Sequence, residues 1–209
     1  MEYSKMTVRD FIRELESSSA TPGGGAAAAL GGAMAGSLCT MAASVTLGRE
    51  AYRDAWTEME SIAGEVRSYT ALLLELMDED PRVYGSVIQA TRMPKTTEVE
   101  KEVREACIQK ALKAACHPPL EILRTVAKIA RLLESLLFKG NPNALADLGT
   151  AAELLSSASK AAAYSLEANL KRIEDASFKE EILGEFCYEL SLVSGSALLA
   201  EKEMTNRLE

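Results

Sequence analysis

The sequence predicts an all-α protein, a single-domain bundle of about eight helices over residues 1–209. Apolar residues recur at the i, i+3, i+4, i+7 spacing of a helix along most of the chain. No segment alternates apolar and polar residues for the length of a strand. Breaks rich in proline and glycine divide the chain into long segments, and none has the composition of an interdomain linker. One helical domain is therefore expected.

The first part of the chain contains three of the predicted helices. Residues 7–10 have the spacing of a capping box, and the apolar residues that follow predict an amphipathic helix to about residue 18. A turn over residues 19–25 ends this helix, and a helix of small residues is expected to follow it to about Leu47. Residues 49–77 then hold one continuous apolar face, which predicts a long helix.

The remaining segments are bounded by proline, asparagine and capping residues. Pro81 is expected to open a short helix that ends before Pro94, because a proline in the first turn loses no hydrogen bond. Asp80 would then be the N-cap of that helix. The pattern predicts four more helices, which cover about 98–116, 120–138, 144–173 and 178–207.

Charge and composition argue against several kinds of partner. The chain has 31 acidic and 23 basic residues, a net charge of −8, and nucleic-acid binding requires clustered positive charge. The single histidine, His117, and the absence of a C-x-x-C motif predict no metal site. The N-terminal residues lack the pattern of a secretory signal, so a cytoplasmic location is expected.

One long uncharged stretch resembles a membrane span by length alone. Ser17 to Gly48 contains no charged residue, but its central part is dominated by glycine and alanine rather than by large apolar residues. We therefore expect a buried helix, not a span, because small residues let neighbouring helices approach closely. The same helix is a candidate for a subunit interface.

The turn Thr21-Pro22-Gly23-Gly24-Gly25 is a candidate binding element. Three glycines before a helix leave backbone N–H groups accessible, which suits an anionic group or a flat heterocycle. The residues that define a P-loop or a G-x-G-x-x-G turn are absent. A flexible connector into a tightly packed helix is the alternative.

Two aspartates have both a structural and a chemical interpretation. Asp80 as a cap is the simpler one, but a carboxylate enclosed by the fold can act as a general base. Asp147 follows Asn141 and Asn143, at a position where a negative charge favours the start of a helix. Together these three residues form a polar cluster that could hydrogen-bond a heterocycle.

The ordered set of motifs resembles the cyclodeaminase/cyclohydrolase family of folate enzymes over nearly the whole chain. The segments that carry the resemblance are Phe11 to Leu15, the Thr21–Gly25 turn, the Ala/Gly helix, Val45 to Tyr52, Asp80 with Tyr84, Met93-Pro94-Lys95, Pro118-Pro119-Leu120, Gly140 to Asp147, and Ala168-Asn169-Leu170. The resemblance implies a helical enzyme that assembles as a homodimer, acts on a tetrahydrofolate derivative and needs no resident cofactor or metal.

The resemblance also implies roles for individual residues. Asp80 would be the catalytic carboxylate, and the turn formed by Pro22, Gly23, Gly24 and Gly25 would line the pteridine pocket. Further contacts in the same pocket would come from Asn141, Asn143, Asp147 and Asn169, and from Arg49 and Lys95 toward the glutamate tail.

Two reactions at the N5–C–N10 bridge of folate fit the resemblance. Ser44 and the Met93-Pro94-Lys95 segment favour the cyclohydrolase subgroup, which converts 5,10-methenyltetrahydrofolate and water to 10-formyltetrahydrofolate. The alternative is formiminotetrahydrofolate cyclodeaminase, which releases ammonia and forms the methenyl bridge. A non-catalytic folate-binding protein is the alternative of another class, because Ala146 and Ser165 stand where family members usually carry Ser and Asn.

Overall fold

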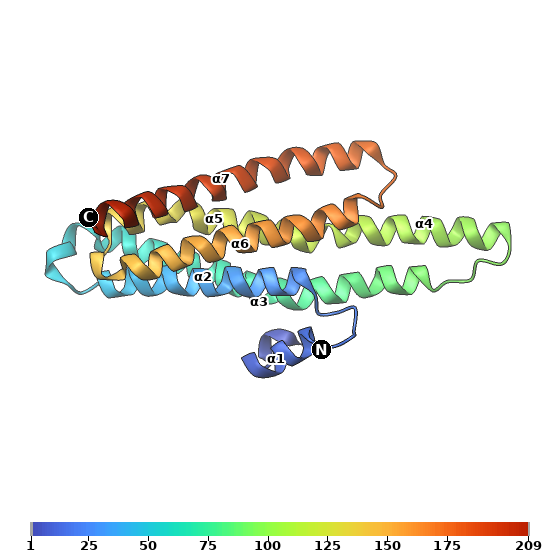
Figure 1. Cartoon of the computed structure of the whole chain (residues 1–209), viewed down its shortest axis with the longest axis horizontal. Coiled ribbons are helices and arrows are strands. Elements are labelled where there is room, and N and C mark those ends of the chain that lie inside the picture. The colour runs from blue at the N-terminus through green and yellow to red at the C-terminus, as the bar shows by residue number, and fades with distance from the viewer. Residues whose placement is uncertain (1, 209) are drawn as a thin grey trace.

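The described residues, 2–208 of a computed structural model, contain seven α-helices and three short 3₁₀ helices, and no strand. Six of the α-helices are long and form an elongated body, whereas the short first helix lies beside it (Figure 1). The α-helices are α1 (Val8–Leu15), α2 (Gly24–Thr46), α3 (Trp56–Thr91), α4 (Glu98–Ala115), α5 (His117–Lys139), α6 (Leu145–Leu170) and α7 (Ala176–Leu208). The 3₁₀ helices are η1 (Tyr3–Lys5), η2 (Glu50–Ala55) and η3 (Pro142–Ala144). The all-α prediction is confirmed for this part of the chain.

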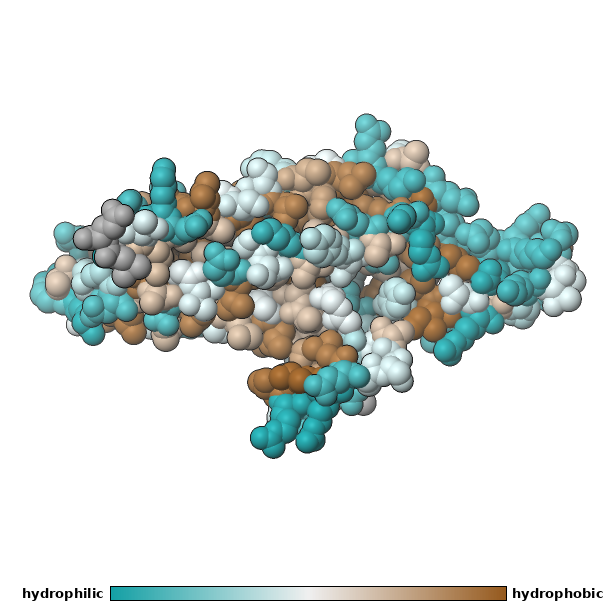
Figure 2. Space-filling model, in the orientation of Figure 1, coloured by the Kyte–Doolittle hydropathy of each residue, from teal (hydrophilic) through white to brown (hydrophobic). Residues whose placement is uncertain are grey.

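Helix α5 contacts all the other long helices, α2 packs against α3, α5 and α6 with one face exposed, and α7 covers α5 and α6. The C-terminal end of α3 and the N-terminal part of α4 extend beyond the other helices as a two-helix arm (Figure 1), whereas the C-terminal end of α4 contacts α6. The arm tip is strongly hydrophilic, whereas hydrophobic residues appear on α1 and along the middle of the body (Figure 2). The body and the arm therefore differ in surface character.

Helix α1 is attached through the short η1 segment that precedes it. The backbone N–H of Ser4 donates to Oδ1 of Asp78 on α3 at 3.0 Å, and the Ser4 hydroxyl also hydrogen-bonds to Asp78. Phe11 is buried, with its ring edge-on to Tyr3 at a centroid distance of 6.2 Å. These contacts fix α1 beside α3.

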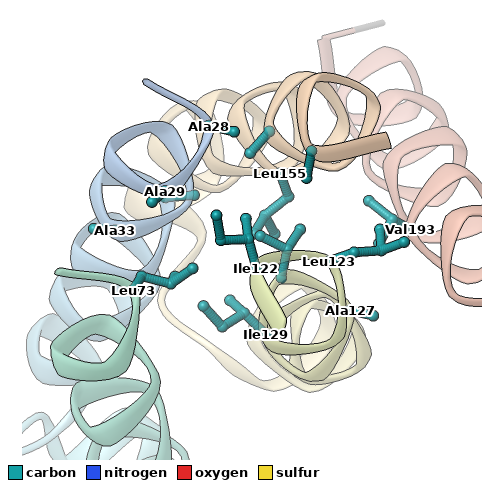
Figure 3. Close-up of a cluster of buried hydrophobic side chains, with 14 of the residues drawn as sticks. Ala28, Ala29, Ala33, Leu73, Ile122, Leu123, Ala127, Ile129, Leu155 and Val193 are labelled. Carbon is teal, nitrogen blue, oxygen red and sulfur yellow. The ribbon is translucent and has the colours of Figure 1, made fainter. Parts of the chain in front are cut away.

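The core is built from small residues on α2 and large aliphatic residues on the helices around it. Leu73 of α3, Ile122 of α5 and Leu155 of α6 converge opposite the alanines of α2, while Leu123 of α5 points toward Val193 of α7 (Figure 3). A β-carbon at Gly32 would lie 3.0 Å from a methyl group of Val126 and 3.1 Å from one of Leu73. The glycines of α2 thus set the spacing of the helices.

The number of helices is seven rather than about eight within residues 2–208, because Pro81 does not begin a new helix. Helix α3 continues through Pro81, which is buried inside it. The prediction failed because a proline only removes one hydrogen bond and crowds the preceding turn, and burial of the apolar face on both sides of Pro81 outweighs that cost. Asp80 is consequently an interior residue of α3 and not its N-cap.

Other predicted boundaries are close to the observed ones. Thr97 and Glu100 form a full capping box at the start of α4. Asp175 caps α7, since its Oδ1 accepts the Phe178 N–H at 3.1 Å. Pro118 and Pro119 lie in the first turn of α5, so that only Cys116 separates α4 from α5.

By length and composition, α2 and the α7 segment Ala176–Arg207 could each cross a membrane. In α2, 56% of the most apolar window is buried inside the protein, whereas in α7 the share is 11%. The prediction of a buried helix is thus confirmed for more than half of this window of α2. The exposed face of α7 carries Leu183, Tyr188 and Leu198.

We expect Gly36→Ala to lower the free energy of unfolding by about 1–3 kcal/mol, the usual effect of overpacking. The new methyl group would collide with the Thr70 side chain and contact Val66 and Ile129 at 3.4 Å. Gly64→Ala on α3 is the matched control, because no heavy atom lies within 4 Å of its β-carbon position. That control should be neutral or stabilise by up to about 1 kcal/mol. Urea unfolding of both variants measures the difference, and equal stabilities would contradict the spacing argument.

Candidate functional site

A pocket of about 310 Å³ opens between α3 and α6, at the N-terminal end of α2. It contains five residues predicted from the sequence, namely Gly23, Gly24, Gly25, Asp80 and Asn169. The rest of its lining is formed by Ala20, Thr21, Tyr84, Ser165, Ala168 and Arg172. The structure therefore brings together three segments that are far apart in the sequence.

The Asp80 carboxylate lies against the first turn of α2. A β-carbon at residue 25 would collide with the carboxyl group, so only glycine permits this approach. The N-cap residue of α2 is Gly23, which has no side chain to bond the free N–H groups of the first turn. Asp80 places a carboxylate against this turn from the neighbouring helix, and its interaction with the Ala26 N–H favours the ionised form.

Burial raises the pKa of Asp80 from its usual 3.8 to about 6. The hydrogen bond from Ala26 acts in the opposite direction but is the smaller effect. The positive end of the α2 dipole also favours the ionised form. A carboxylate in this state is ionised at neutral pH and still basic enough to accept a proton, as general-base catalysis requires.

The α6 side of the pocket is formed by residues on one helical face. Ser165 and Asn169 are four residues apart, so they lie on the same face of α6. The Ser165 hydroxyl is 3.5 Å from the β-carbon position of Gly24, an ordinary van der Waals distance. Asn169 is buried, and its side-chain N–H donates to the Ala115 carbonyl at 2.8 Å. This bond ties the wall of the pocket to the end of α4.

Comparison with known proteins identifies the family. The family model described as "Formiminotransferase-cyclodeaminase" matches residues 7–187. The chain belongs to the formiminotransferase-cyclodeaminase family. The prediction made from the sequence motifs is thereby confirmed.

Characterised members of the formiminotransferase-cyclodeaminase family differ in length and in name. A protein of Methylorubrum extorquens named methenyltetrahydrofolate cyclohydrolase is 34% identical over 179 residues, which are 86% of each chain. The mouse formimidoyltransferase-cyclodeaminase is 32% identical over 94% of this chain, but the match spans only 38% of the mouse protein. The solved structure of formiminotetrahydrofolate cyclodeaminase from Thermotoga maritima has 27% identity and a TM-score of 0.90, and the match covers all of both chains.

The second group of family motif residues lies at the opposite end of α2. Asn141 is buried, its backbone N–H donates to the Thr46 hydroxyl at 2.9 Å, and its side chain donates to the Val45 carbonyl at 3.2 Å. The Asn141 side chain also accepts the Asn143 N–H at 3.0 Å. Because α2 has 23 residues, this group is about 34 Å from Gly24 along the helix.

Four predicted residues therefore do not line the pocket of the same chain. Asn141 fastens the α5–α6 connection to the end of α2, and Asn143 precedes α6. Asp147 occupies the first turn of α6, as expected, and Arg49 follows α2. We call these four residues the distal cluster.

The two remaining predicted residues flank other parts of the site. Pro22 is buried directly before the pocket glycines, after a cis Thr21–Pro22 peptide bond. Lys95 is exposed in the α3–α4 connection and is absent from the pocket lining. Of the two positions where the chain departs from the family pattern, Ser165 lines the pocket and Ala146 lies at the distal end of α6.

Sequence reasoning missed Arg172 as a site residue and noted Tyr84 only as part of a motif. Helical spacing places each of them near a residue that was predicted. Tyr84 is one turn after Asp80 on α3, and Arg172 follows Asn169 by three residues at the end of α6. Spacing alone does not identify them as site residues, because it does not show that α3 and the end of α6 meet at one pocket.

The side chains of the described residues do not form a metal-binding site. No group of three or more His, Cys, Asp or Glu side chains in residues 2–208 could hold a metal ion. His117 is exposed at the first position of α5. The expectation that the family reaction needs no resident metal or cofactor stays a prediction.

We expect Asp80→Asn to raise the free energy of unfolding at pH 7.5 by at most about 3 kcal/mol, since each unit of pKa shift corresponds to about 1.4 kcal/mol. The folded state raises the pKa of Asp80, so its protonated form favours folding. This stabilisation is complete below about pH 3.8 and is lost as the pH rises through about 6. Asparagine imitates the protonated form at all pH values.

The measurement is chemical denaturation of wild type and variant at pH 7.5 and pH 4. The difference between them should be large at pH 7.5 and should nearly vanish at pH 4. Glu60→Gln, an exposed residue on the same helix, is the control for removing one negative charge. A pH-independent difference would contradict the raised pKa.

Proposed function

We propose that the protein is a folate one-carbon enzyme, a methenyltetrahydrofolate cyclohydrolase that converts 5,10-methenyltetrahydrofolate and water to 10-formyltetrahydrofolate. The observation that carries the proposal is the Asp80 carboxylate, enclosed in a pocket and with a pKa of about 6. The name of the Methylorubrum extorquens relative, which matches over 86% of both chains, supports it.

The chemistry of the substrate fits a site with one carboxylate. The methenyl bridge between N5 and N10 is a cation, so its carbon is already electrophilic. Asp80 can attract this charge and remove a proton from the attacking water as the new C–O bond forms. The bond from the carbon to N5 then breaks and N5 accepts a proton. The hydroxyl group of the adduct loses its proton and becomes the carbonyl oxygen of the formyl group on N10, so one proton is released overall.

The same pocket supports formiminotetrahydrofolate cyclodeaminase as the second candidate. The Thermotoga maritima protein of that name matches this chain over its whole length. In that reaction N10 attacks the carbon of the protonated formimino group, and the N10 proton passes to the formimino nitrogen. The bond from the carbon to that nitrogen then breaks, which releases ammonia and leaves the methenyl cation. Asp80 would move the proton from N10 toward the leaving nitrogen.

The non-catalytic alternative is weaker at this site. Ala146 lies at the distal end of α6, outside the pocket lining of its own chain. Ser165 keeps a hydroxyl group in the lining.

The working unit that we propose is a homodimer in which α2 packs antiparallel on α2 of a second copy. The exposed face of α2 has no charged residue, and Met34, Met41 and Val45 are 51%, 39% and 38% exposed on it. Val8 and Ile12 of the projecting α1 add exposed apolar surface. A two-fold axis near the middle of α2 would bring the distal cluster of one subunit to the Asp80 pocket of the other.

For catalysis, we expect Asp80→Asn to lower kcat by roughly 10²- to 10⁴-fold, the range for a positioned general base, while folate binding persists. For the wild type, kcat/KM should fall as the pH drops below about 6, because protonated Asp80 cannot accept a proton. The decay of the ultraviolet band of 5,10-methenyltetrahydrofolate measures both the kcat of the variant and the pH dependence of the wild type.

The same assay separates the two candidate reactions. Ammonia release from 5-formiminotetrahydrofolate, without that decay, would select the cyclodeaminase. Unchanged turnover in the variant would contradict the assignment of Asp80.

For assembly, sedimentation should give twice the chain mass of 22.5 kDa, and Met34→Glu should shift the protein to the monomer. A buried charge in an apolar interface is strongly unfavourable. Ser194→Glu, on the exposed side of α7, is the control and should leave the dimer intact. A monomeric Ser194→Glu variant, together with a dimeric Met34→Glu variant, would place the interface on α7.

A mixture of Asp80→Asn and Asp147→Asn subunits tests whether the site is shared. In each mixed dimer one site would contain both substitutions and the other would contain neither. Recovery of activity on mixing would therefore support a shared site, and no recovery would contradict it.

A further inference from the structure

The Asp80 pocket has a second charged residue that the sequence did not indicate. Among its lining residues, Asp80 on α3 is anionic and Arg172 on the α6–α7 turn is the one cation. Arg49 and Lys95, the cations predicted from the family resemblance, do not line the pocket in the same chain. The pocket therefore offers charges of opposite sign from opposite walls.

The backbone of Arg172 is fixed by contacts outside the pocket. Its N–H donates to the Asn169 carbonyl at 3.1 Å, and its carbonyl accepts Nε2–H of Gln109 at 3.1 Å. Oε1 of the same Gln109 accepts the Glu174 N–H at 2.9 Å. One amide group on α4 thus holds the turn at two points, so the base of the Arg172 side chain has a defined position.

The guanidinium of Arg172 is free to bind a ligand. The residue is exposed, and in the described residues no carboxylate lies within salt-bridge distance of it. By contrast, Lys113 and Arg131 each pair with an acid of the α7 region, Asp175 and Glu189. Arg172 is therefore not used to fasten α7 to the bundle.

We propose that Arg172 binds a carboxylate of the substrate's glutamate tail and so fixes the direction in which folate enters the pocket. This inference rests on the proposed function. The reacting bridge of methenyltetrahydrofolate is cationic and its glutamate end is anionic, which matches the two charged walls. A planar guanidinium binds a carboxylate through two parallel hydrogen bonds, which gives orientation as well as affinity.

The first test compares Arg172→Ala and Arg172→Lys with Lys171→Ala. Lys171 is the matched control, because it is an adjacent exposed cation that does not line the pocket. Arg172→Ala should raise KM for 5,10-methenyltetrahydrofolate by about 10- to 100-fold, as expected for a charged hydrogen bond, with kcat changed less than about threefold. Arg172→Lys should recover part of the loss. An unchanged KM in Arg172→Ala would overturn the proposal.

The second test uses the corresponding methenyl compound that lacks the glutamate group. If Arg172 binds glutamate, this substrate should have a raised KM with the wild type, and Arg172→Ala should raise it no further. If Arg172→Ala raised KM equally for both substrates, Arg172 would not act through the glutamate group, and this result would also overturn the proposal.

The outcome for Arg172 can be separated from the outcome for the reaction. If the wild type hydrolyses neither compound, the proposed function fails, and calorimetric binding of 5-formyltetrahydrofolate then decides the question of Arg172. A 10- to 100-fold weaker affinity in Arg172→Ala, with Lys171→Ala unchanged, would support the carboxylate contact. Equal affinities would reject it.

Discussion

The close approach of α2 to α3 is the constraint on which the rest of the structure depends. At Gly25 and Gly36 of α2 there is no space for a β-carbon, because the side chains of Asp80 and Thr70 on α3 occupy it. At Gly36 this contact builds the core. At Gly25 it places the Asp80 carboxylate on the first turn of α2, where burial changes its pKa and the helix supplies a hydrogen bond. The same contact between α2 and α3 therefore accounts for the packing at Gly36 and for the position of the Asp80 carboxylate.

The helical class and most helix boundaries could be predicted because they depend on local patterns. The capping box at Thr97 and Glu100 and the cap at Asp175 are decided by residues within one turn. The prediction that Pro81 begins a new helix was wrong because local patterns do not decide the structure at this position. Its local effect is to break a helix, but residues on α3 before and after it, such as Met77 and Val87, are both buried in the same core. Tertiary burial therefore decided between one helix and two.

The site could be predicted only in part, because sequence motifs do not say which ends of long helices meet. Asp80, Asn169 and the glycine turn meet because the N-terminal end of α2 and the C-terminal end of α6 both lie against the interior of α3 at Asp80. Asn141 belongs to the same family motif set, yet its hydrogen bonds to Val45 and Thr46 place it at the other end of α2. Arg172 was missed because its position depends on Gln109, on a helix 63 residues earlier in the chain.

The uncharged stretch from Ser17 to Gly48 has a consequence for whatever contacts the outer face of α2. Without charges, that face has no pattern of opposite charges to select a partner or to fix its alignment, so shape and the hydroxyl groups of Ser37 and Ser44 must do so. Its methionines, Met34 and Met41, are flexible and adapt to an opposing surface. Contacts formed there would be insensitive to ionic strength, because there is no Coulomb attraction for salt to screen.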